Sequence, residues 1–395
     1  MYVLNTTNAT NTKNTVVNHS RKDILSPVKR VVIKIGSGVL TTKEGLNLDV
    51  INTLSEDIYD LMKKRGLEII LVSSGAIASG IRKMGLSQRP QSISQQQAVA
   101  AIGQSSLMLA YEEAFKRYGR KVAQVLVTRD DLTNRMRYLN TRNTLFTLLN
   151  WKVIPIINEN DTVVVEEIKF GDNDNLSAMM AILADANLLI NLTSIDGLFD
   201  DDPRSNKDAH LIPRVEKVTS RIEKTASSIP GTLGKGGMQS KVKAARDVAM
   251  CGIPTIIANG LKENIMSTIF EGREEGTLFL PQPMPMRRRK HWIAFTKSPK
   301  GRIMVDRGAE DALVKREKSL LPSGVISVYG RFSTGDSVTI INREERGLAV
   351  GLVNYHSTDV EKIMGLKSAE IEKRLGYKHY DEVVHKDNLV LMKNP

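Results

Sequence analysis

The sequence of 395 residues contains a single cysteine, Cys251, so no disulfide can form within the chain. A secreted scaffold held together by disulfides is therefore excluded, and one cysteine suits a reducing compartment. No apolar run approaches the roughly 18 residues of a membrane-spanning helix, and the first residues lack the apolar segment of a signal peptide. We therefore expect a cytoplasmic protein that has no membrane partner.

Several motifs of known chemistry are also absent. Six scattered histidines and one cysteine give no spacing typical of metal ligands, so we expect no metal held by protein side chains. The chain has no Walker phosphate loop, no dinucleotide-binding glycine fingerprint and no protein-kinase signature. The stretch DNDN does not begin a calcium loop, because Ser177 and Leu183 stand where glycine and glutamate are needed.

The formal net charge of +12 raises nucleic acid as a partner. Aromatic residues make up only 5% of the chain, which leaves few rings for stacking on bases. Beyond RRRK at 287–290 there is no arginine-rich block. Because a protein that handles small anions accounts for the charge equally well, charge alone leaves both alternatives open.

Up to about residue 280, short runs rich in Val and Ile alternate with longer helical patterns, such as the one over 48–66 that closes with basic residues and glycine. Runs without polar alternation are typical of strands buried on both faces of a parallel sheet. The pattern predicts an α/β fold, a three-layer α/β/α sandwich with a mainly parallel sheet. The expected strands are RVVIKIG (30–36), LEIILVSSG (67–75), KVAQVLVT (121–128), KVIPIIN (152–158), NLLINLT (187–193) and IPTIIAN (253–259).

The composition and the pattern of predicted strands change after residue 280. The stretch LPQPMPMRRRKH contains three prolines and a basic cluster, which indicates a linker. Short alternating strands with glycine-rich turns follow, as in a small β-barrel. We therefore predict a disordered tail over 1–27, an α/β domain over 28–280, a linker over 281–291 and a β-barrel domain over 292–395.

Ligands of open α/β sheets bind beyond the carboxyl ends of the strands, so the residues that follow each strand are informative. Lys34 interrupts an apolar run just before a Gly-Ser-Gly stretch, and is either on a solvent face or buried beside an anion. SSGA (73–76) is either a helix cap or an anion-binding helix start. NEND (158–161) is either a turn or the site where a carboxylate receives a substrate ammonium.

Two stretches lead directly into helices. FGDNDNLSA (170–178) crowds four Asp and Asn residues at the mouth of a helix, although one cap needs only one of them. LGKGGMQSK (233–241) is a glycine-rich entry to a helix N-terminus, which presents free N–H groups to a phosphate. Lysines without a nucleophile or metal cluster suit phosphoryl transfer, where positioning and charge neutralisation supply most of the catalysis.

Six stretches in this order resemble the bacterial glutamate 5-kinase family of the amino acid kinase superfamily: VVIKIGSGVL, LVSSGAIASG, INENDTV, FGDNDNLSA, DGLFDDDPRSN and LGKGGMQSK. From Trp292, with MVDRGAEDAL and LLPSGV, the chain is similar to a PUA domain. The resemblance spans roughly residues 28 to 392. It implies ATP-dependent phosphorylation of the side-chain carboxylate of L-glutamate to L-glutamyl 5-phosphate, the first step of proline biosynthesis, with proline as an inhibitor.

The resemblance also implies roles for individual residues. Lys34 and Lys241 would be the catalytic lysines, and Asp174 the carboxylate that holds them in place. Mg²⁺ would be carried by the nucleotide phosphates. Ser194 and Lys235 depart from the family pattern. The implied glutamate-binding residues are Ser74, Asp161 and Asn173, and the implied ATP-binding residues are Lys34, Thr193, Ser194, Lys235, Gly236, Gly237, Met238, Gln239, Ser240 and Lys241.

The resemblance further implies a homo-oligomer and hand-over of the product to glutamate-5-semialdehyde dehydrogenase. Within the superfamily the alternatives are acetylglutamate kinase and aspartokinase, but KIGSGVL differs from the KFGGTS of aspartokinase and the added β-barrel argues against both. An alternative of another class is an RNA-binding or RNA-modifying protein, because PUA domains elsewhere bind RNA.

Overall fold

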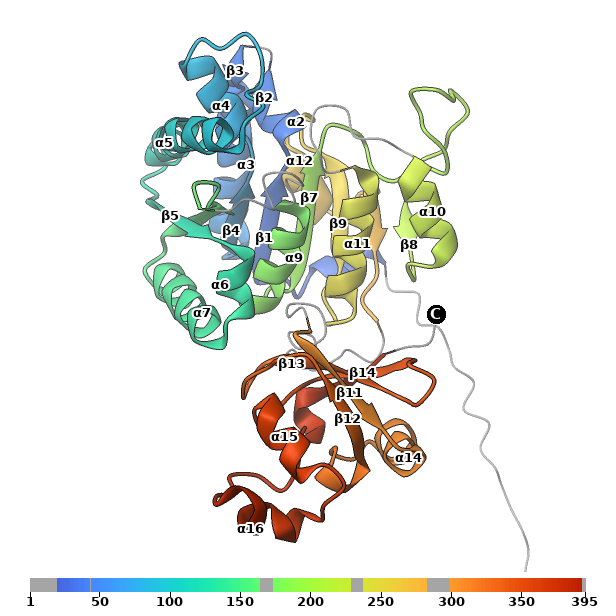
Figure 1. Cartoon of the computed structure of the whole chain (residues 1–395). Helices are drawn as coiled ribbons and strands as arrows, with labels where there is room; N and C mark the ends of the chain where they lie inside the picture. The colour runs from blue at the N-terminus through green and yellow to red at the C-terminus, as the bar shows by residue number, and fades with distance from the viewer. Residues whose placement is uncertain (1–19, 43, 164–172, 229–236, 283–298, 393–395) are drawn as a thin grey trace, which may run out of the picture.

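The computed structural model describes residues 20–42, 44–163, 173–228, 237–282 and 299–392. Within these ranges the chain forms two units, each with its own sheet (Figure 1). An eight-stranded sheet belongs to the larger unit, and a five-stranded sheet to the C-terminal one. The predicted linker over 281–291 falls almost entirely outside the described residues, and the predicted domain boundaries stay predictions.

The large sheet contains every strand that was expected before residue 280. All neighbouring strands are parallel except β9 and β10, which pair antiparallel. The fold class predicted from the unalternated apolar runs is therefore confirmed. In spatial order the strands are β5 (Val122–Val127), β6 (Ile154–Glu159), β4 (Glu68–Ser73), β1 (Arg30–Ile35), β7 (Leu188–Thr193), β9 (Thr255–Asn259), β10 (Thr277–Phe279) and β8 (Arg214–Val215).

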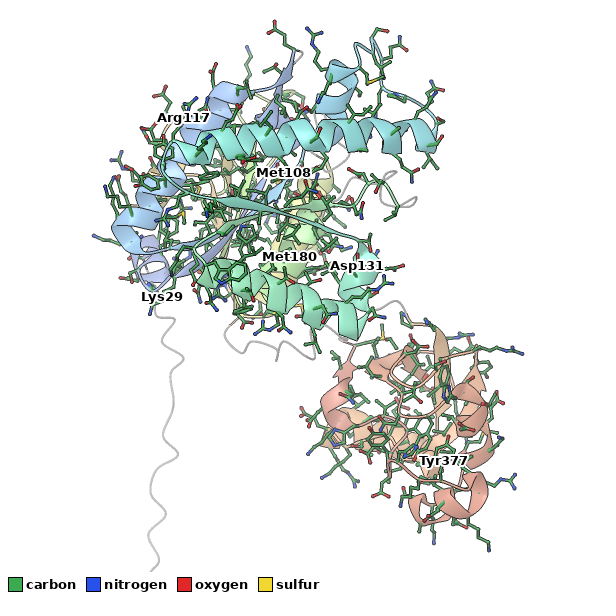
Figure 2. The ribbon with its side chains drawn as sticks, turned by 90° about the vertical axis from the view of Figure 1, so that its left-hand side faces the viewer. Lys29, Met108, Arg117, Asp131, Met180 and Tyr377 are labelled. Carbon is green, nitrogen blue, oxygen red and sulfur yellow. The ribbon has the colours of Figure 1, made fainter. Side chains whose placement is uncertain are left out.

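Helices cover both faces of this sheet, because its central strands are apolar on both sides. Successive residues of β1 enter different cores: Ile33 packs with α3, α5 and α12, whereas Val32 packs with α7, α9 and α11. Met108 of α5 packs against the first of these cores and Met180 of α9 lies in the second (Figure 2). The helices of this unit are α1 (Arg21–Leu25), α2 (Ser37–Leu40), α3 (Leu48–Arg65), α4 (Ala76–Lys83), α5 (Ile93–Lys116), α6 (Arg129–Thr133), α7 (Arg135–Asn150), α9 (Asn173–Leu183), α10 (Ser220–Ser228), α11 (Met238–Ala249) and α12 (Ile265–Phe270). A small hairpin of β2 (Thr41–Thr42) and β3 (Gly45–Leu46) lies beside them.

Residues 20–27, which we expected to be part of a disordered tail, are ordered. They include α1, whose Leu25 is fully buried in the core. Arg21 is also buried and donates hydrogen bonds to the backbone carbonyls of Pro213, Arg273, Glu275 and Gly276. A polar stretch of sequence gives no sign of such a clamp, because its partners lie about 190 to 255 residues away along the chain.

Helices α4 and α5 cross at backbone contact. A Cβ added at Gly80 would lie 1.8 Å from the carbonyl oxygen of Val99, and one added at Gly103 would lie 1.8 Å from that of Ala76. Only glycine fits at this crossing. The crossing fixes the start of α4, and therefore the Ser73–Gly75 turn that precedes it.

We expect Gly103→Ala to lower the free energy of unfolding by about 3 kcal/mol or more, because the added methyl group meets backbone atoms that cannot move aside. Ser105→Ala on the exposed side of the same helix is the matched control and should change stability by less than about 0.5 kcal/mol. Chemical denaturation monitored by circular dichroism measures both. Equal stability of the two variants would contradict the packing described here.

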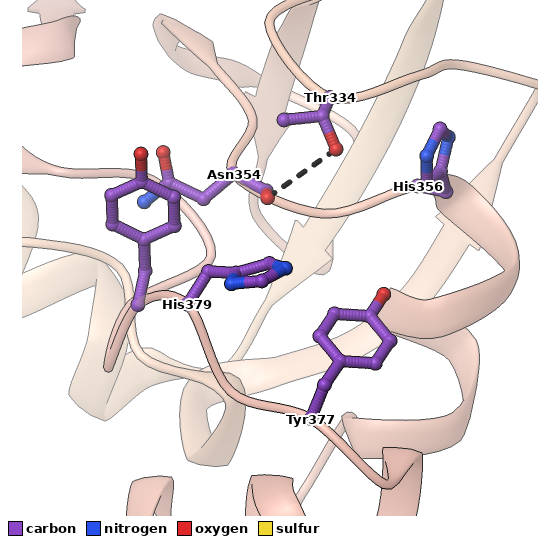
Figure 3. Close-up of a pocket in the computed structure, with 6 residues that line it drawn as sticks. Thr334, Asn354, His356, Tyr377 and His379 are labelled. Atoms are coloured by element: carbon purple, nitrogen blue, oxygen red, sulfur yellow. Dashed lines mark hydrogen bonds between the residues drawn. The ribbon is translucent and has the colours of Figure 1, made fainter.

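The C-terminal unit folds around its own core. The strands of its sheet are, in spatial order, β12 (Val325–Tyr329), β11 (Gly301–Val305), β13 (Ser337–Ile341), β14 (Gly347–Leu352) and β15 (Leu389–Leu391), and its helices are α14 (Arg307–Arg316), α15 (Ser357–Ile363) and α16 (Ile371–Leu375). Tyr138 of α7 packs against Val350, Leu352 and Val390 of this unit. Figure 3 shows a pocket lined by Thr334, Asn354, His356, Tyr377, His379 and Tyr380. No helix in the described ranges combines the length and apolar character that crossing a membrane requires.

Candidate active site

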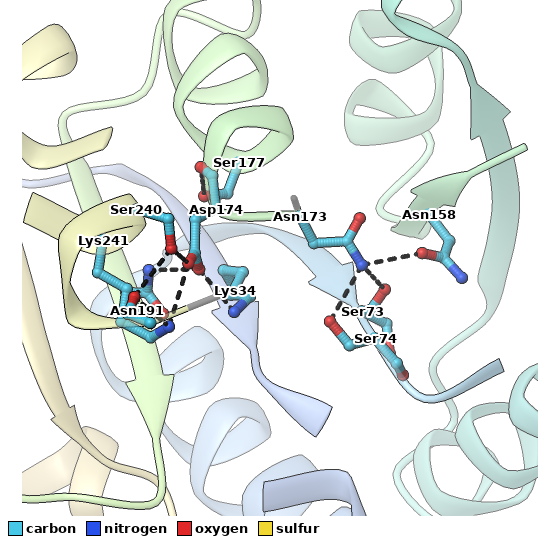
Figure 4. Close-up of polar contacts among 11 residues, drawn as sticks. Lys34, Ser73, Ser74, Asn158, Asn173, Asp174, Ser177, Asn191, Ser240 and Lys241 are labelled. Atoms are coloured by element: carbon cyan, nitrogen blue, oxygen red, sulfur yellow. Dashed lines mark hydrogen bonds and ion pairs between the residues drawn. The ribbon is translucent and has the colours of Figure 1, made fainter. Parts of the chain in front are cut away.

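The central strands of the large sheet and two helix N-termini meet at one edge. Lys34 lies near the carboxyl end of β1, Ser73 ends β4, and Asn191 lies near the end of β7. Helices α9 and α11 begin over the same edge (Figure 4). Open α/β sheets bind their ligands at the edge where the connections from neighbouring strands run toward opposite ends of the sheet. In this sheet that point lies at β1, which has β4 on one side and β7 on the other.

Asp174 lies between the two predicted catalytic lysines. Lys34 Nζ is 2.6 Å from Asp174 Oδ1, and Lys241 Nζ is 3.1 Å from Asp174 Oδ2 (Figure 4). The exposed fraction is 5% for Lys34, 2% for Asp174 and 6% for Lys241, so all three charged groups are buried. Of the two alternatives for Lys34, the structure supports the buried lysine beside an anion.

Two further donors complete the contacts of this carboxylate. Ser240 donates from its hydroxyl to Asp174 Oδ2 at 2.5 Å, and Asn191 donates from Nδ2 to Asp174 Oδ1 at 3.0 Å. Each carboxylate oxygen therefore accepts one bond from a lysine and one from a neutral group. With this many donors the carboxylate is held in one orientation and in its ionised form.

The charge of this cluster is unbalanced. Burial alone would raise the pKa of Asp174, but Lys34 and Lys241 outweigh it and hold that pKa far below its usual range. Two buried ammonium groups and one carboxylate leave a net charge of +1. Because a buried positive charge attracts negative groups strongly, the cluster is suited to receive an anion. The residues present thus fit a phosphate group.

Helix α9 begins inside the Asp/Asn-rich stretch rather than after it. Asn173 is its first residue and Asp174 lies in its first turn, where a carboxylate is favoured by the helix dipole. Ser177 donates from its hydroxyl to the Asp174 carbonyl at 2.7 Å, which tightens this turn. Asp172 lies outside the described residues. The surplus of polar residues is explained in part, because Asn173 and Asp174 point into two different networks (Figure 4).

Asn173 belongs to a second network beside β4. Its Nδ2 donates to the Ser73 carbonyl at 2.9 Å, to Ser74 Oγ at 3.0 Å and to Asn158 Oδ1 at 3.1 Å. Its Oδ1 is buried and finds no hydrogen-bond partner among the described residues. A buried amide oxygen without a partner is available to a ligand N–H group. The structure thus brings together two of the three predicted glutamate-binding residues, Ser74 and Asn173.

The third predicted glutamate-binding residue is Asp161, which follows β6 on the same edge and is partly buried. Burial raises its pKa to about 6, although the positive charge of Arg89 acts in the opposite direction. No contact in the described ranges joins it to Asn173 or Ser74. A carboxylate whose pKa is shifted by burial at this edge of the sheet is a candidate for a functional group.

Apart from Lys34, the predicted ATP-binding residues that the structure describes lie in two places, at the end of β7 and at the start of α11. Thr193 ends β7 and Ser194 follows it, where a Cβ at Gly38 would approach Ser194 Oγ to 3.1 Å. Gly237 is the N-cap of α11, and Ser240 and Lys241 lie in its first turns. Gln239 is exposed.

The Met238 side chain is 3% exposed and packs in a hydrophobic cluster with Leu198 and Val242. The Met238 side chain is therefore part of the core, and the predicted contact of Met238 with ATP stays a prediction. Lys235 and Gly236 lie outside the described residues.

Some residues of the site were not singled out from the sequence. Gln104 accepts through Oε1 from Asn158 Nδ2 at 2.9 Å, and Asn158 in turn accepts from Asn173. The buried hydroxyl of Tyr111 contacts Ser73 at 3.0 Å. Asn191 was missed although a signal was present, since an amide stands alone in the apolar run LLINLT.

Comparison with known proteins agrees with this geometry. The amino acid kinase family matches residues 29–259, and the PUA domain matches residues 301–375. The chain is 52% identical to the glutamate 5-kinase of Syntrophotalea carbinolica over 94% of its own length and 100% of that protein. The glutamate 5-kinase of Geobacter sulfurreducens gives the same identity and coverage. Among solved structures, the UMP kinase of Bacillus anthracis has a TM-score of 0.45 at 17% identity, over 65% of this chain and 97% of that one.

The family match and the identity over nearly the whole chain support the same interpretation as the site, in which two buried lysines contact one carboxylate. The chain therefore belongs to the amino acid kinase family, in its glutamate 5-kinase branch, and carries a PUA domain after the kinase domain.

Proposed function

We propose that the chain transfers the γ-phosphoryl group of ATP to the side-chain carboxylate of L-glutamate, giving ADP and L-glutamyl 5-phosphate. The observation that carries the proposal is the buried cluster of Lys34, Asp174 and Lys241, whose net charge of +1 is suited to a phosphoryl group. This reaction begins proline biosynthesis.

The proposed chemistry needs no general base. A substrate carboxylate is already ionised at neutral pH, so one of its oxygens attacks the γ-phosphorus while the bond from that phosphorus to the β–γ bridging oxygen breaks. No proton is transferred. Asp174 accepts bonds from Lys34, Lys241, Ser240 and Asn191, so it orients the lysines rather than taking a proton. The lysines neutralise the negative charge on the transferring group and on the departing ADP.

The same edge offers contacts to both substrates. Gly237, as the N-cap of α11, opens a helix start to the nucleotide phosphates. Ser74 and the unpartnered Oδ1 of Asn173 would bind the polar groups of glutamate, and Asp161 would bind its ammonium group. Mg²⁺ would come with the nucleotide phosphates and neutralise part of their charge.

The experiment that tests the proposal is trapping of the acyl phosphate with hydroxylamine, in the presence of ATP and Mg²⁺. Glutamate, N-acetylglutamate and aspartate are offered in parallel. We expect hydroxamate from glutamate alone, because acetylation removes the ammonium that Asp161 receives and aspartate is one methylene shorter. Hydroxamate from another acid would show that the acceptor is that acid and not glutamate. No hydroxamate from any acid would contradict the proposed kinase.

Glutamate binding should depend on pH through Asp161. With a pKa of about 6, its carboxyl group gains a proton below that pH and loses its attraction for the substrate ammonium. We expect the KM for glutamate to rise about tenfold per pH unit below 6, while kcat changes little. Asp161→Asn should raise KM at neutral pH and abolish this dependence. A variant that keeps the dependence on pH would assign it to another group.

The remaining expectations stay predictions. They are inhibition by proline, a homo-oligomer and hand-over of the product to glutamate-5-semialdehyde dehydrogenase. RNA binding by the PUA domain is favoured by one observation, since Tyr377, His379 and Tyr380 gather rings around the pocket of Figure 3. RNA affinity that falls steeply with salt would support this second function.

A further inference from the structure

Asn191 is an unusual residue for its place in the fold. It lies in β7, where the sequence LLINLT is otherwise apolar up to the final threonine, and its side chain is 1% exposed. In the sheet it is level with Lys34 on β1 and with Ile257 on β9. An aliphatic residue would satisfy this position, as it does at Leu189 two residues earlier.

The amide of Asn191 contacts the organising carboxylate directly. Its Nδ2 donates at 3.0 Å to Asp174 Oδ1, the oxygen that also accepts from Lys34, whereas Lys241 and Ser240 bind Oδ2 (Figure 4). Among the described residues, the donors to Oδ1 are Asn191 and Lys34, so without Asn191 the carboxylate would turn more freely about its bond to Cβ. The amide therefore opposes rotation that would pull the two lysines apart.

This contact has a cost in stability. Asn191 Oδ1 is buried and has no hydrogen-bond partner among the described residues. A buried polar atom without a partner is destabilising, and an aliphatic residue would avoid the loss. Residues that disagree with their local environment in this way are concentrated at functional sites.

We propose that Asn191 is a positioning residue for phosphoryl transfer, which assigns one oxygen of Asp174 to each lysine without adding charge. The inference rests on the proposed function of the site. Because the amide is neutral, it orients Asp174 and leaves the net charge of +1 on the cluster intact. A carboxylate at this place would cancel that charge, and an aliphatic side chain would leave the orientation to the lysines alone.

Asn191→Leu removes the bond and keeps the size of the side chain. We expect kcat to fall about tenfold while the KM values for ATP and glutamate change less than about twofold, because the lysines remain but are less well placed. The melting temperature should stay the same or rise, since the unpartnered oxygen is gone. A residue with only a structural role would show the opposite pattern, a lower melting temperature with unchanged kcat.

The control is Thr255→Val on β9, in the same sheet. Thr255 is also 1% exposed, and its Oγ1 likewise lacks a partner among the described residues. Its hydroxyl makes no hydrogen bond to Asp174, so its substitution should leave kcat unchanged.

Asn191→Asp provides a second and independent readout. The groups that face this position are Lys34 from β1, Asp174 from α9, and Ser240 and Lys241 from α11, while Ile257 faces it from β9. When protonated, the introduced carboxyl donates to Asp174 as the amide does. When ionised, it brings the charge of the cluster from +1 to zero and weakens the attraction for the phosphoryl group. The ratio of kcat in the variant to kcat in the wild type should therefore be lowest at high pH.

The test measures kcat, KM and melting temperature for the wild type and the three variants, over roughly pH 6 to 9, by hydroxamate formation. A wild type that forms no hydroxamate would refute the proposed function itself. With an active wild type, a tenfold loss in Asn191→Leu without loss of thermal stability supports the positioning role. A kcat within twofold of wild type in Asn191→Leu, or a wild-type kcat at every pH in Asn191→Asp, would overturn it.

Discussion

Asp174→Asn should lower kcat by about 10³-fold and the free energy of unfolding by about 3 to 5 kcal/mol. The substitution removes the carboxylate that Lys34 and Lys241 share, at 2.6 and 3.1 Å. Two ammonium groups are then buried side by side with no negative charge between them, so the net charge of the cluster rises from +1 to +2. Their mutual repulsion displaces them from the positions that phosphoryl transfer needs.

Steady-state kinetics and chemical denaturation measure the two effects. Asp247→Asn is the matched control, because Asp247 is another buried carboxylate, 6% exposed, that lies on α11 and pairs with Arg246 away from the cluster. Its kcat should stay within about threefold of wild type. An Asp174→Asn variant with wild-type kcat would show that this carboxylate does not organise the lysines.

Lys241→Met should lower kcat by about 10²- to 10³-fold with a much smaller loss of stability. The substitution removes one of the two positive charges offered to the phosphoryl group. It leaves Lys34 and Asp174 as a balanced buried pair, with Ser240 and Asn191 still bonded to the carboxylate. Since the nucleophile is a carboxylate that needs no base, the loss should be equal at every pH between about 7 and 9.

The double variant Asp174→Asn/Lys241→Met separates charge balance from catalysis. Its cluster carries a net charge of +1, as in the wild type, so it should be more stable than Asp174→Asn alone. Its activity should not recover, because the shared carboxylate and one of the two proposed catalytic lysines are both absent. If the two substitutions added independently in stability, the charge coupling described here would be wrong.

Much of the fold could be predicted because it follows from local pattern. A short apolar run such as LEIILV is typical of a strand buried on both faces, and it forms most of β4. The carboxyl ends of such strands must meet at one edge, so the importance of Lys34 and of the residues after β4 could be predicted as well. Gly66 ends α3 in the left-handed conformation, as expected of a glycine after basic residues.

The features that could not be predicted depend on contacts between distant segments. The Arg21 clamp joins the N-terminal helix to carbonyls some 250 residues away. The burial of the Met238 side chain against Leu198 could not be predicted either, because it depends on how α11 packs against a distant segment. The role of Asn191 is of the same kind, since its partner Asp174 lies on another element, although its isolation in an apolar strand gave a signal.

The measurement that tests the central claim most directly follows the oxygen atoms of the acceptor. Glutamate labelled with ¹⁸O in its side-chain carboxylate is incubated with the enzyme, ATP, Mg²⁺ and hydroxylamine. Hydroxylamine attacks the acyl carbon of glutamyl phosphate and expels phosphate with the oxygen that bridged carbon and phosphorus. We predict inorganic phosphate that carries one ¹⁸O atom, visible as a shifted ³¹P resonance. Phosphate without the label would mean that water, and not the glutamate carboxylate, accepts the phosphoryl group.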